Sequence, residues 1–197
     1  MKNRLFLLIL VLSILIISGC KSTPAVPSLD DFEEKPLPPG NIDTNLEPGT
    51  KIAGGNVNTN EIGGNNLAVI TVQKSTSPVS NDGSFTTLVS SEGAQLIMVV
   101  DGNNKLRAYA ISLPQSSDNI IFDASSTAKG SIFFTPGILS IDPQEAENRL
   151  RIIVDLSCYP ELVSYLKGKL KTKDLVEINT NQEYVSLLTN CINEYPK

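Results

Sequence analysis

Few side chains in this sequence are suited to catalysis, because none of its 197 residues is a histidine. Histidine is the commonest general base near neutral pH and a frequent metal ligand, so Ser-His-Asp catalysis, Cys-His catalysis and His-ligated metal sites are excluded. Two carboxylate pairs remain, Asp142 with Glu145 and Glu145 with Asp155. Asp142 precedes a proline at a predicted helix start, where a carboxylate caps the backbone, so we interpret these acids as structural.

Two further patterns come near to known chemistry. Residues 101–105, Asp-Gly-Asn-Asn-Lys, resemble part of a calcium-binding loop, but a lysine occupies the fifth position and no glutamate closes the loop. Ser126 and Lys129 have the Ser-x-x-Lys spacing that penicillin-recognising enzymes carry at a helix start, but the partner motifs Ser-Asp-Asn and Lys-Thr-Gly are missing. We therefore expect no catalytic residue, no metal site and no cofactor, and we predict that the protein is not an enzyme.

The first residues have the features of an export signal. Lys2 and Arg4 precede an apolar run from Leu5 to Ile17. This run is too short for a membrane span, which needs about 20 residues. We predict a signal peptide at residues 1–19. The alternative is an uncleaved anchor helix that ends in a buried cysteine.

The end of this segment resembles the lipobox of bacterial lipoproteins. Ile17, Ser18 and Gly19 supply a branched apolar residue and two small residues before Cys20. In that family the cysteine is diacylated and becomes the new N-terminus, so the resemblance implies palmitate-like acyl chains on Cys20. Several acyl chains on one residue anchor a protein more stably than a single chain does. The resemblance thus implies a lipid-anchored protein of the cell envelope that faces the periplasm or the exterior.

A linker rich in proline and acidic residues is expected from residue 20 to residue 50. It holds half of the 12 prolines and six acidic residues against two lysines. Such a segment does not bury enough apolar surface to fold, and it extends, so we expect it to space the body from the membrane. The alternative is a docking motif at Pro24-Ala25-Val26-Pro27. The formal net charge of -5 argues against a nucleic-acid partner.

Residues 51–123 have the pattern of an antiparallel β-sandwich. Short runs rich in Val, Ile and Phe alternate with turn clusters at spacings of about 10 residues. Tight turns are expected at 81–83 and 101–104, where Asn, Asp and Gly tolerate positive φ, and we predict a hairpin at each. Within the fifth run, Arg107, Tyr109 and Ser112 are expected on the solvent face. The six predicted strands are 52–57, 67–73, 84–89, 95–101, 105–112 and 119–122.

The order of these signals resembles carboxypeptidase-regulatory-like, transthyretin-like domains. Gly55-Asn56-Val57 and the strand at 68–72 precede Asn81-Asp82-Gly83-Ser84-Phe85, and a glycine about ten residues later begins the segment 93–99. In that family a seven-stranded sandwich carries an Asp-Gly-x-Phe hairpin, whereas a seventh strand is not evident in this sequence. The resemblance implies a non-catalytic accessory or binding module.

Residues 124–197 are predicted to form a small helical subdomain of three to four helices. We expect a short helix at 128–135 after N-cap candidates at 125–127, and later helices that begin near Asp142, at Pro160 and at a capping box in 180–183. The expected fold class is therefore α+β, with an N-terminal antiparallel β-sandwich followed by this helical part.

Two features of the helical part bear on stability and binding. If Cys20 is acylated, Cys158 and Cys191 remain, and a bridge between them would stabilise an exported protein by roughly 4 kcal/mol in the chain-entropy model. The alternative is two buried thiols. Four lysines alternate at positions 167, 169, 171 and 173. We interpret them as a solvated helix end, with a patch for an anionic ligand as the alternative.

Together these patterns favour a lipid-anchored envelope protein whose body is a non-catalytic accessory or protein-binding module. The expected partners are the membrane, through Cys20, and an envelope protein. The alternative is a carbohydrate or peptidoglycan binder, in which Tyr109, Tyr159 and Tyr165 would supply aromatic faces to a chain without tryptophan. An exposed line of tyrosines would favour the sugar binder, and a broad apolar patch would favour the protein binder.

Overall fold

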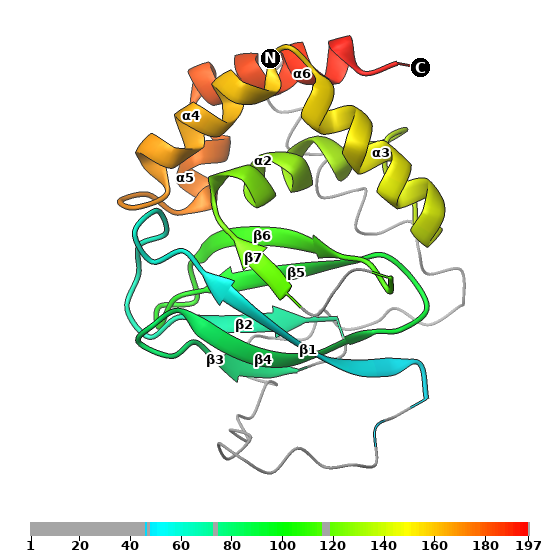
Figure 1. Ribbon diagram of the computed structural model, residues 1–197. Helices are drawn as coiled ribbons and strands as arrows, with labels where there is room; N and C mark the ends of the chain where they lie inside the picture. The colour runs from blue at the N-terminus through cyan, green and yellow to red at the C-terminus, as the bar shows by residue number, and fades with distance from the viewer. Residues whose placement is uncertain (1–45, 47, 73–74, 116–118, 197) are drawn as a thin grey trace, which may run out of the picture. The chain divides into compact units, whose positions relative to one another are not determined.

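The computed structural model describes residues 46, 48–72, 75–115 and 119–196. The predicted signal peptide, the lipobox with Cys20 and nearly all of the linker lie outside the described residues. The described part contains seven strands and five helices (Figure 1). They are β1 (Thr50–Val57), β2 (Ala68–Thr71), β3 (Thr76–Pro78), β4 (Ser84–Ser90), β5 (Gln95–Val100), β6 (Leu106–Ser112), β7 (Asn119–Phe122), α2 (Ala124–Phe133), α3 (Pro143–Asp155), α4 (Tyr159–Lys169), α5 (Leu175–Asn179) and α6 (Gln182–Glu194).

The strands form two sheets, in the orders β4-β1-β7 and β3-β2-β5-β6. Alternate residues of β4 and β5 are buried, as the period of a strand requires. The buried residues of both sheets belong to one apolar core, in which the rings of Phe85 and Phe122 lie 5.5 Å apart. The ladders are antiparallel except for that of β1 with β7, which is parallel and places Val57 opposite Phe122. This parallel pair departs from the predicted antiparallel arrangement.

The six predicted strands are confirmed to within two residues at each end. The structure adds β3, which the sequence pattern did not reveal. This strand has three residues and ends in Pro78, so it is too short to show an alternating pattern. The described residues are therefore α+β, as predicted, with mainly antiparallel strands first and helices after them.

One predicted hairpin is confirmed and the other is wrong. The turn at 101–104 joins the antiparallel strands β5 and β6, and Asn104 has a φ of 58°. The segment at 81–83 is also a tight turn, since the Ser80 amide donates to the Ser84 carbonyl over 2.8 Å. However, β3 pairs with β2 and β4 pairs with β1, so this turn carries the chain from one sheet to the other. Turn chemistry determines the local reversal of the chain and leaves the pairing partner open.

The predicted starts of α3 near Asp142 and of α6 within 180–183 are correct, and the starts of α4 and α2 need correction. Asp142 caps α3 and accepts from the Glu145 amide over 2.8 Å. Helix α4 begins one residue before the predicted Pro160. Helix α2 begins at Ala124 rather than at 128, because Asp123 and Ser126 form a reciprocal capping box. The described residues contain five helices rather than three to four, since the five-residue α5 was not predicted.

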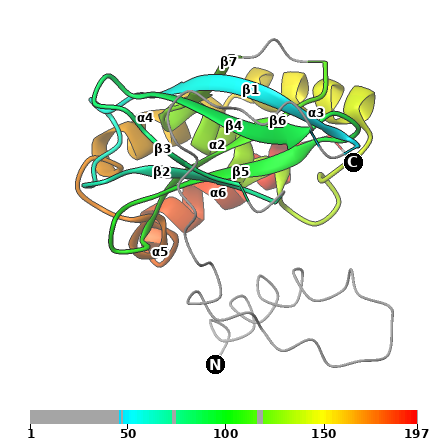
Figure 2. The same ribbon diagram turned by 90° about the horizontal axis from the view of Figure 1, so that it is seen from below.

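The helices gather on one side of the strands, and α2 lies nearest to β6 and β7 (Figure 1). Seen from below, the strands lie in front of most of the helices (Figure 2). The close contact of α2 with β6 depends on a glycine. A Cβ atom at Gly130 would lie only 2.5 Å from Cδ2 of Tyr109, so any larger residue there would push the helix off the strand.

The prediction that Arg107, Tyr109 and Ser112 face solvent is wrong, because Arg107 and Ser112 are 6% and 3% exposed and Tyr109 packs against α2. Arg107 lies under the helices. Its Nε donates to the Gly63 carbonyl over 2.7 Å, and its Nη2 donates to the Leu170 carbonyl over 3.3 Å. Its Nη1 lies 3.8 Å from Oδ2 of the buried Asp101. Arg107 therefore connects β6, the loop before β2 and the end of α4.

A second polar network joins the same strand to the helices. Ser131 of α2 donates to the Thr127 carbonyl over 2.8 Å, so its oxygen accepts from the hydroxyls of Tyr109 and Tyr184, each at 2.7 Å. Burial raises the pKa of Tyr109 and raises that of Tyr184 well above its ordinary value, so both remain proton donors. One serine thus connects β6, α2 and α6.

Cys158, just before α4, and Cys191 of α6 form a disulfide with their Cα atoms 5.5 Å apart. The bridge lies entirely within the helical part. Glu194 supports the same junction, since its carboxylate accepts from the hydroxyl of Ser157 over 3.0 Å and from the Cys158 amide over 3.2 Å. The hydrogen bond that the Ser157 amide donates to the same carboxylate is the main cause that lowers the pKa of Glu194, and these two bonds add to it.

Candidate functional site

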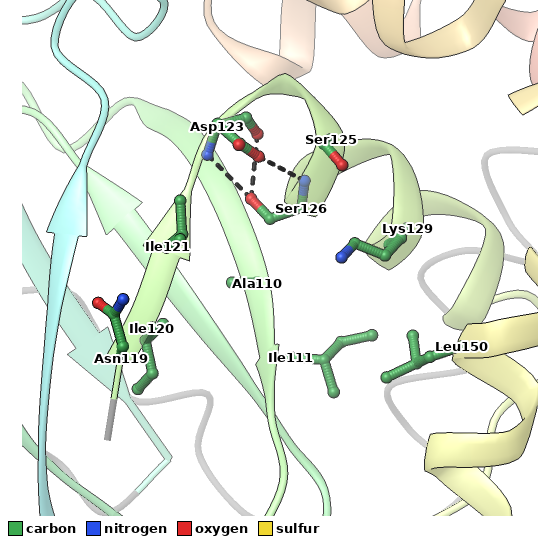
Figure 3. Close-up of a pocket in the computed structure, with 10 residues that line it drawn as sticks. All are labelled: Ala110, Ile111, Asn119, Ile120, Ile121, Asp123, Ser125, Ser126, Lys129 and Leu150. Atoms are coloured by element: carbon green, nitrogen blue, oxygen red, sulfur yellow. Dashed lines mark hydrogen bonds between the residues drawn. The ribbon is translucent and has the colours of Figure 1, made fainter. Parts of the chain in front are cut away.

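The two sheets end side by side at β6 and β7. β6 is an edge strand of the four-stranded sheet, and β7 is an edge strand of the three-stranded sheet. No ladder joins these two strands in the described part of the chain. An open cavity of about 260 Å³ lies at this seam, between the two strands, the start of α2 and the middle of α3 (Figure 3). We call it the seam pocket. Its apolar lining is Ala110, Ile111, Ile120, Ile121 and Leu150, and its polar lining is Asn119, Asp123, Ser125, Ser126 and Lys129.

The alternation of β7 explains the apolar lining. Ile120 points toward the core and is 7% exposed, whereas its neighbour Ile121 is 48% exposed. Successive side chains of a strand point to opposite faces, so a pair of isoleucines in an edge strand must leave one outside the core. Exposed apolar side chains on an edge strand favour association with other chains, so they mark candidate contact sites.

The capping box of α2 supplies the polar side of the seam pocket. The Ser126 amide donates to Oδ1 of Asp123 over 2.7 Å, and the Ser126 hydroxyl donates to the Asp123 carbonyl over 3.0 Å. The same hydroxyl accepts from the Asp123 amide over 2.9 Å. Ser126 and Lys129, the two residues of the Ser-x-x-Lys pattern, therefore both line the pocket. The proton of Ser126 is directed to the backbone rather than to Lys129.

Lys129 extends from α2 toward the pocket (Figure 3). It is half-buried and has no ion pair or hydrogen-bond partner in the described part of the structure. Asp123, the single acid in the pocket lining, is engaged in the cap. The ammonium group of Lys129 is therefore an uncompensated positive charge beside an apolar surface.

Ser125 lies at the rim of the pocket and contacts α4. Tyr159 donates its proton to the Ser125 carbonyl over 2.9 Å, so the Ser125 hydroxyl, 2.8 Å from the tyrosine oxygen, acts as the donor to Tyr159. Burial raises the pKa of Tyr159, which keeps it protonated. Ser125 thus has a lone pair left for a hydrogen bond from a ligand.

The three tyrosines considered for sugar binding do not form an exposed line. Tyr109 bonds to Ser131 beneath α2, and Tyr159 is 8% exposed. Tyr165 is partly buried and its ring lies 5.9 Å from that of Tyr184. These contacts account for the three side chains as parts of the helix packing.

Three of the four alternating lysines contact the protein itself. Lys167 lies 3.4 Å from the Glu61 carboxylate, Lys169 lies 5.6 Å from the centre of the Tyr165 ring, and Lys171 donates to the Thr59 carbonyl. The carboxylate of Glu61 also accepts from the Ala124 amide over 3.0 Å. Lys167 and Lys171 therefore hold the end of α4 against the loop after β1, whereas Lys169 contacts its own helix.

A second open hollow, of about 410 Å³, lies between the loop after α2 and the end of α6. Its lining is Pro136, Gly137, Ile138, Ile192, Tyr195 and Pro196, and it includes no charged side chain. The seam pocket is the stronger candidate because it combines an apolar surface with a charge.

Within the described residues, no three His, Cys, Asp or Glu side chains lie close enough to share a metal ion. The described helices also include none with the length and apolar character of a membrane span. Among the pocket residues, Ser125 and Ser126 were expected as helix-cap candidates, and Ser126 and Lys129 had also been considered for catalysis. Comparison of the chain with protein-family models, with curated proteins and with solved structures gave no match.

Proposed function

We propose that this protein is a lipid-anchored component of the cell envelope whose folded body is a non-catalytic module that binds another protein. The anchor part rests on the sequence before the described residues. A positive start, a short apolar run and the series Ile17-Ser18-Gly19-Cys20 agree with one another. Acyl chains on Cys20 would hold the protein at the membrane, and the linker up to residue 50 would space the body from it.

The binding part rests on the seam pocket, which is the observation that carries the proposal. Ile121 is half-exposed on an edge strand, and it lines an open pocket that combines aliphatic side chains with polar ones and an unpaired lysine. Apolar surface rimmed by polar groups is typical of a protein interaction site. Catalysis has no comparable support, because the hydroxyl of Ser126 is engaged in the helix cap.

We further propose that residues 51–123 form a β-sandwich similar to carboxypeptidase-regulatory-like domains and that residues 124–197 form a helical subdomain. Two sheets with a shared core and a tight Asp82-Gly83 turn before β4 support it. The helices would then be an addition to the sandwich that covers one of its seams. Modules of this kind serve as accessory or binding domains.

Metabolic labelling with an alkyne analogue of palmitate tests the anchor. We expect the full chain to incorporate the label and to sediment with membranes, and we expect a Cys20→Ser chain to do neither. A chain with Cys158→Ser and Cys191→Ser is the matched control, because it loses two cysteines and keeps the label. Label on the Cys20→Ser chain would contradict the anchor.

Site-specific crosslinking in native membranes tests the binding part. A photoreactive amino acid is placed at Ile121 in the seam pocket or, as the control, at Val176, which is 66% exposed on α5. We expect one envelope protein to be crosslinked from position 121 and not from position 176, and to be lost when Leu150→Glu places a charge in the pocket lining. Equal products from both positions, or peptidoglycan fragments as the product at position 121, would overturn the proposal.

A further inference from the structure

The charge in the seam pocket indicates the sign of the ligand group. Lys129 lacks a partner in the described structure, and Asp123 is already engaged by Ser126. A carboxylate on a lysine ammonium forms a charge-assisted hydrogen bond, which is about twice as strong as a neutral one. Most of the backbone amides at the start of α2 are already engaged. Those of Ala124, Ser126 and Thr127 already have partners.

The apolar lining indicates the second group of the ligand. It consists of aliphatic side chains from three elements, β6, β7 and α3, and includes no aromatic ring. Burial of an aliphatic side chain against such a surface removes apolar area from water, which favours binding. A leucine, isoleucine or valine side chain therefore fits this lining better than a sugar, which needs aromatic faces and hydrogen bonds.

The size and openness of the pocket indicate how these two groups are joined. Its volume is about 260 Å³, which is smaller than a usual pocket for a complete small molecule, about 300–1,000 Å³. The pocket opens to solvent, so a ligand larger than one residue is able to continue outside it. Asn119 and Ser125 also line the pocket, and the side-chain amide of Asn119 and the free lone pair of Ser125 can bond to a peptide backbone.

We propose that the seam pocket binds the C-terminal residue of a partner polypeptide. The terminal carboxylate contacts Nζ of Lys129, and a branched aliphatic side chain contacts Ile111, Ile121 and Leu150. This inference rests on the proposed protein-binding function and names the part of the partner that is recognised. Recognition of a C-terminal carboxylate is a recurring mode of peptide binding, and here a lysine would take the place of the usual backbone amides.

Fluorescence polarisation with two labelled peptides tests the inference. The probes are fluorescein-Gly-Gly-Ser-Gly-Leu with a free carboxylate and the same peptide with a C-terminal amide, each titrated with the full chain in detergent micelles. We expect the free carboxylate to bind at least tenfold more tightly than the amide, because a hydrogen bond to a charged group is worth about 1.5–3 kcal/mol. Equal binding of the two peptides would overturn the inference.

Lysine variants assign the effect to the pocket. We expect Lys129→Met to weaken binding of the carboxylate peptide at least tenfold and to leave binding of the amide peptide unchanged. Lys129→Arg should retain binding within about threefold, which also shows that the site still folds. Lys173→Met is the control, because it removes the same charge between α4 and α5. It should leave the binding of both peptides unchanged. A Lys129→Met chain that binds like the parent chain would contradict the inference.

A competition experiment with a small carboxylic acid tests whether the pocket binds a polypeptide end or a small molecule. If 4-methylpentanoate competes at the same concentration as the unlabelled peptide, the pocket binds a small molecule and the polypeptide end is refuted. The crosslinking experiment separates this failure from that of the proposed function. Loss of the carboxylate preference with crosslinking from position 121 intact refutes only the chain end. Loss of both refutes the protein-binding function as well.

Discussion

Buried polar groups have different surroundings in two regions of this molecule, between the two sheets and between β6 and the helices. Between the sheets, the hydroxyls of Thr71 and Ser77 and both side-chain amide atoms of Gln95 are buried without a hydrogen-bond partner in the described structure. Thr71 lies opposite Ile97, and Gln95 lies two positions before Ile97 in β5. The side chains of Thr71 and Gln95 therefore share one face of the sheet.

Under the helices, most buried polar groups have partners. Arg107 contacts two carbonyls and Asp101, and Ser131 accepts from Tyr109 and Tyr184. The hydroxyl of Thr127 is the exception on α2. Directional hydrogen bonds therefore specify how the helices dock on β6. Between the sheets, the hydroxyls of Ser75 and Thr87 share one hydrogen bond over 3.2 Å, and ordered water is the natural partner of the polar atoms that lack one.

The largest expected effect on stability concerns the disulfide between Cys158 and Cys191. It tests how much of the stability of the helical part depends on this bridge. Replacing both Cys158 and Cys191 with alanine should lower the free energy of unfolding by about 4 kcal/mol, because the bridge constrains a long loop of the unfolded chain. Urea denaturation of the full chain, followed by circular dichroism, measures this change. Reduction of the parent chain with dithiothreitol should give the same loss. A loss below about 1 kcal/mol would mean that the packing of the helices suffices without the bridge.

The Arg107 contacts are expected to rank second. Arg107→Met leaves Asp101 buried without its cation, and loss of one partner of a buried pair costs about 3–5 kcal/mol. We expect a value near the lower end, about 3 kcal/mol, because Asp101 keeps bonds from the amides of Asn103 and Lys105. Addition of Asp101→Asn to this variant should recover part of the loss in urea denaturation. A double variant less stable than Arg107→Met would show that the charge of Asp101 is satisfied without Arg107.

The serine shared by two tyrosines provides the third test. Ser131→Ala leaves two buried hydroxyls without their acceptor, and we expect a loss of about 2 kcal/mol. Tyr109→Phe is the matched control, since it removes one hydroxyl and leaves the bond from Tyr184 to Ser131. It should cost less than half as much in the same denaturation measurement. An equal cost for both variants would argue against Ser131 as the common acceptor.

The smallest expected effect has the opposite sign and concerns the space between the sheets. Gln95→Met replaces an unpartnered buried amide with an apolar side chain of similar size, and we expect a change between zero and a gain of about 1 kcal/mol. Thermal unfolding by differential scanning calorimetry measures it. A loss above about 2 kcal/mol would show that ordered water satisfies the amide, and the contrast between the two regions would disappear.

The strands were predictable because their alternation is strong, as in β5, where Gln95, Ile97 and Val99 are buried in turn. The helix start at Asp142 was predictable because its cap lies within four residues of sequence. The burial of Arg107 was not predictable from its own strand, since its partners are Gly63 and Leu170, which are far away in the chain. In the sequence pattern of a strand, polar residues that face a layer of helices cannot be told from polar residues that face water.

The seam pocket was not predictable for a related reason. It exists because β7 pairs with β1 and leaves β6 unpaired on one side, and no local pattern specifies that choice. One signal was available in the sequence. The spacing of Asp123 and Ser126 is that of a capping box, and it would have placed the start of α2, and with it Lys129, beside the end of β7.

The parallel pairing of β1 with β7 also has a consequence for the order of folding. β1 is the middle strand of its sheet, and five other strands separate it from β7 along the chain. Non-local contacts of this kind slow folding, because the entropy of closing a long loop is lost before the contact forms. The sheet stays incomplete until residues 119–122 are available to pair. For the exported protein that we propose, this sheet would therefore be completed only after residues 119–122 have crossed the membrane.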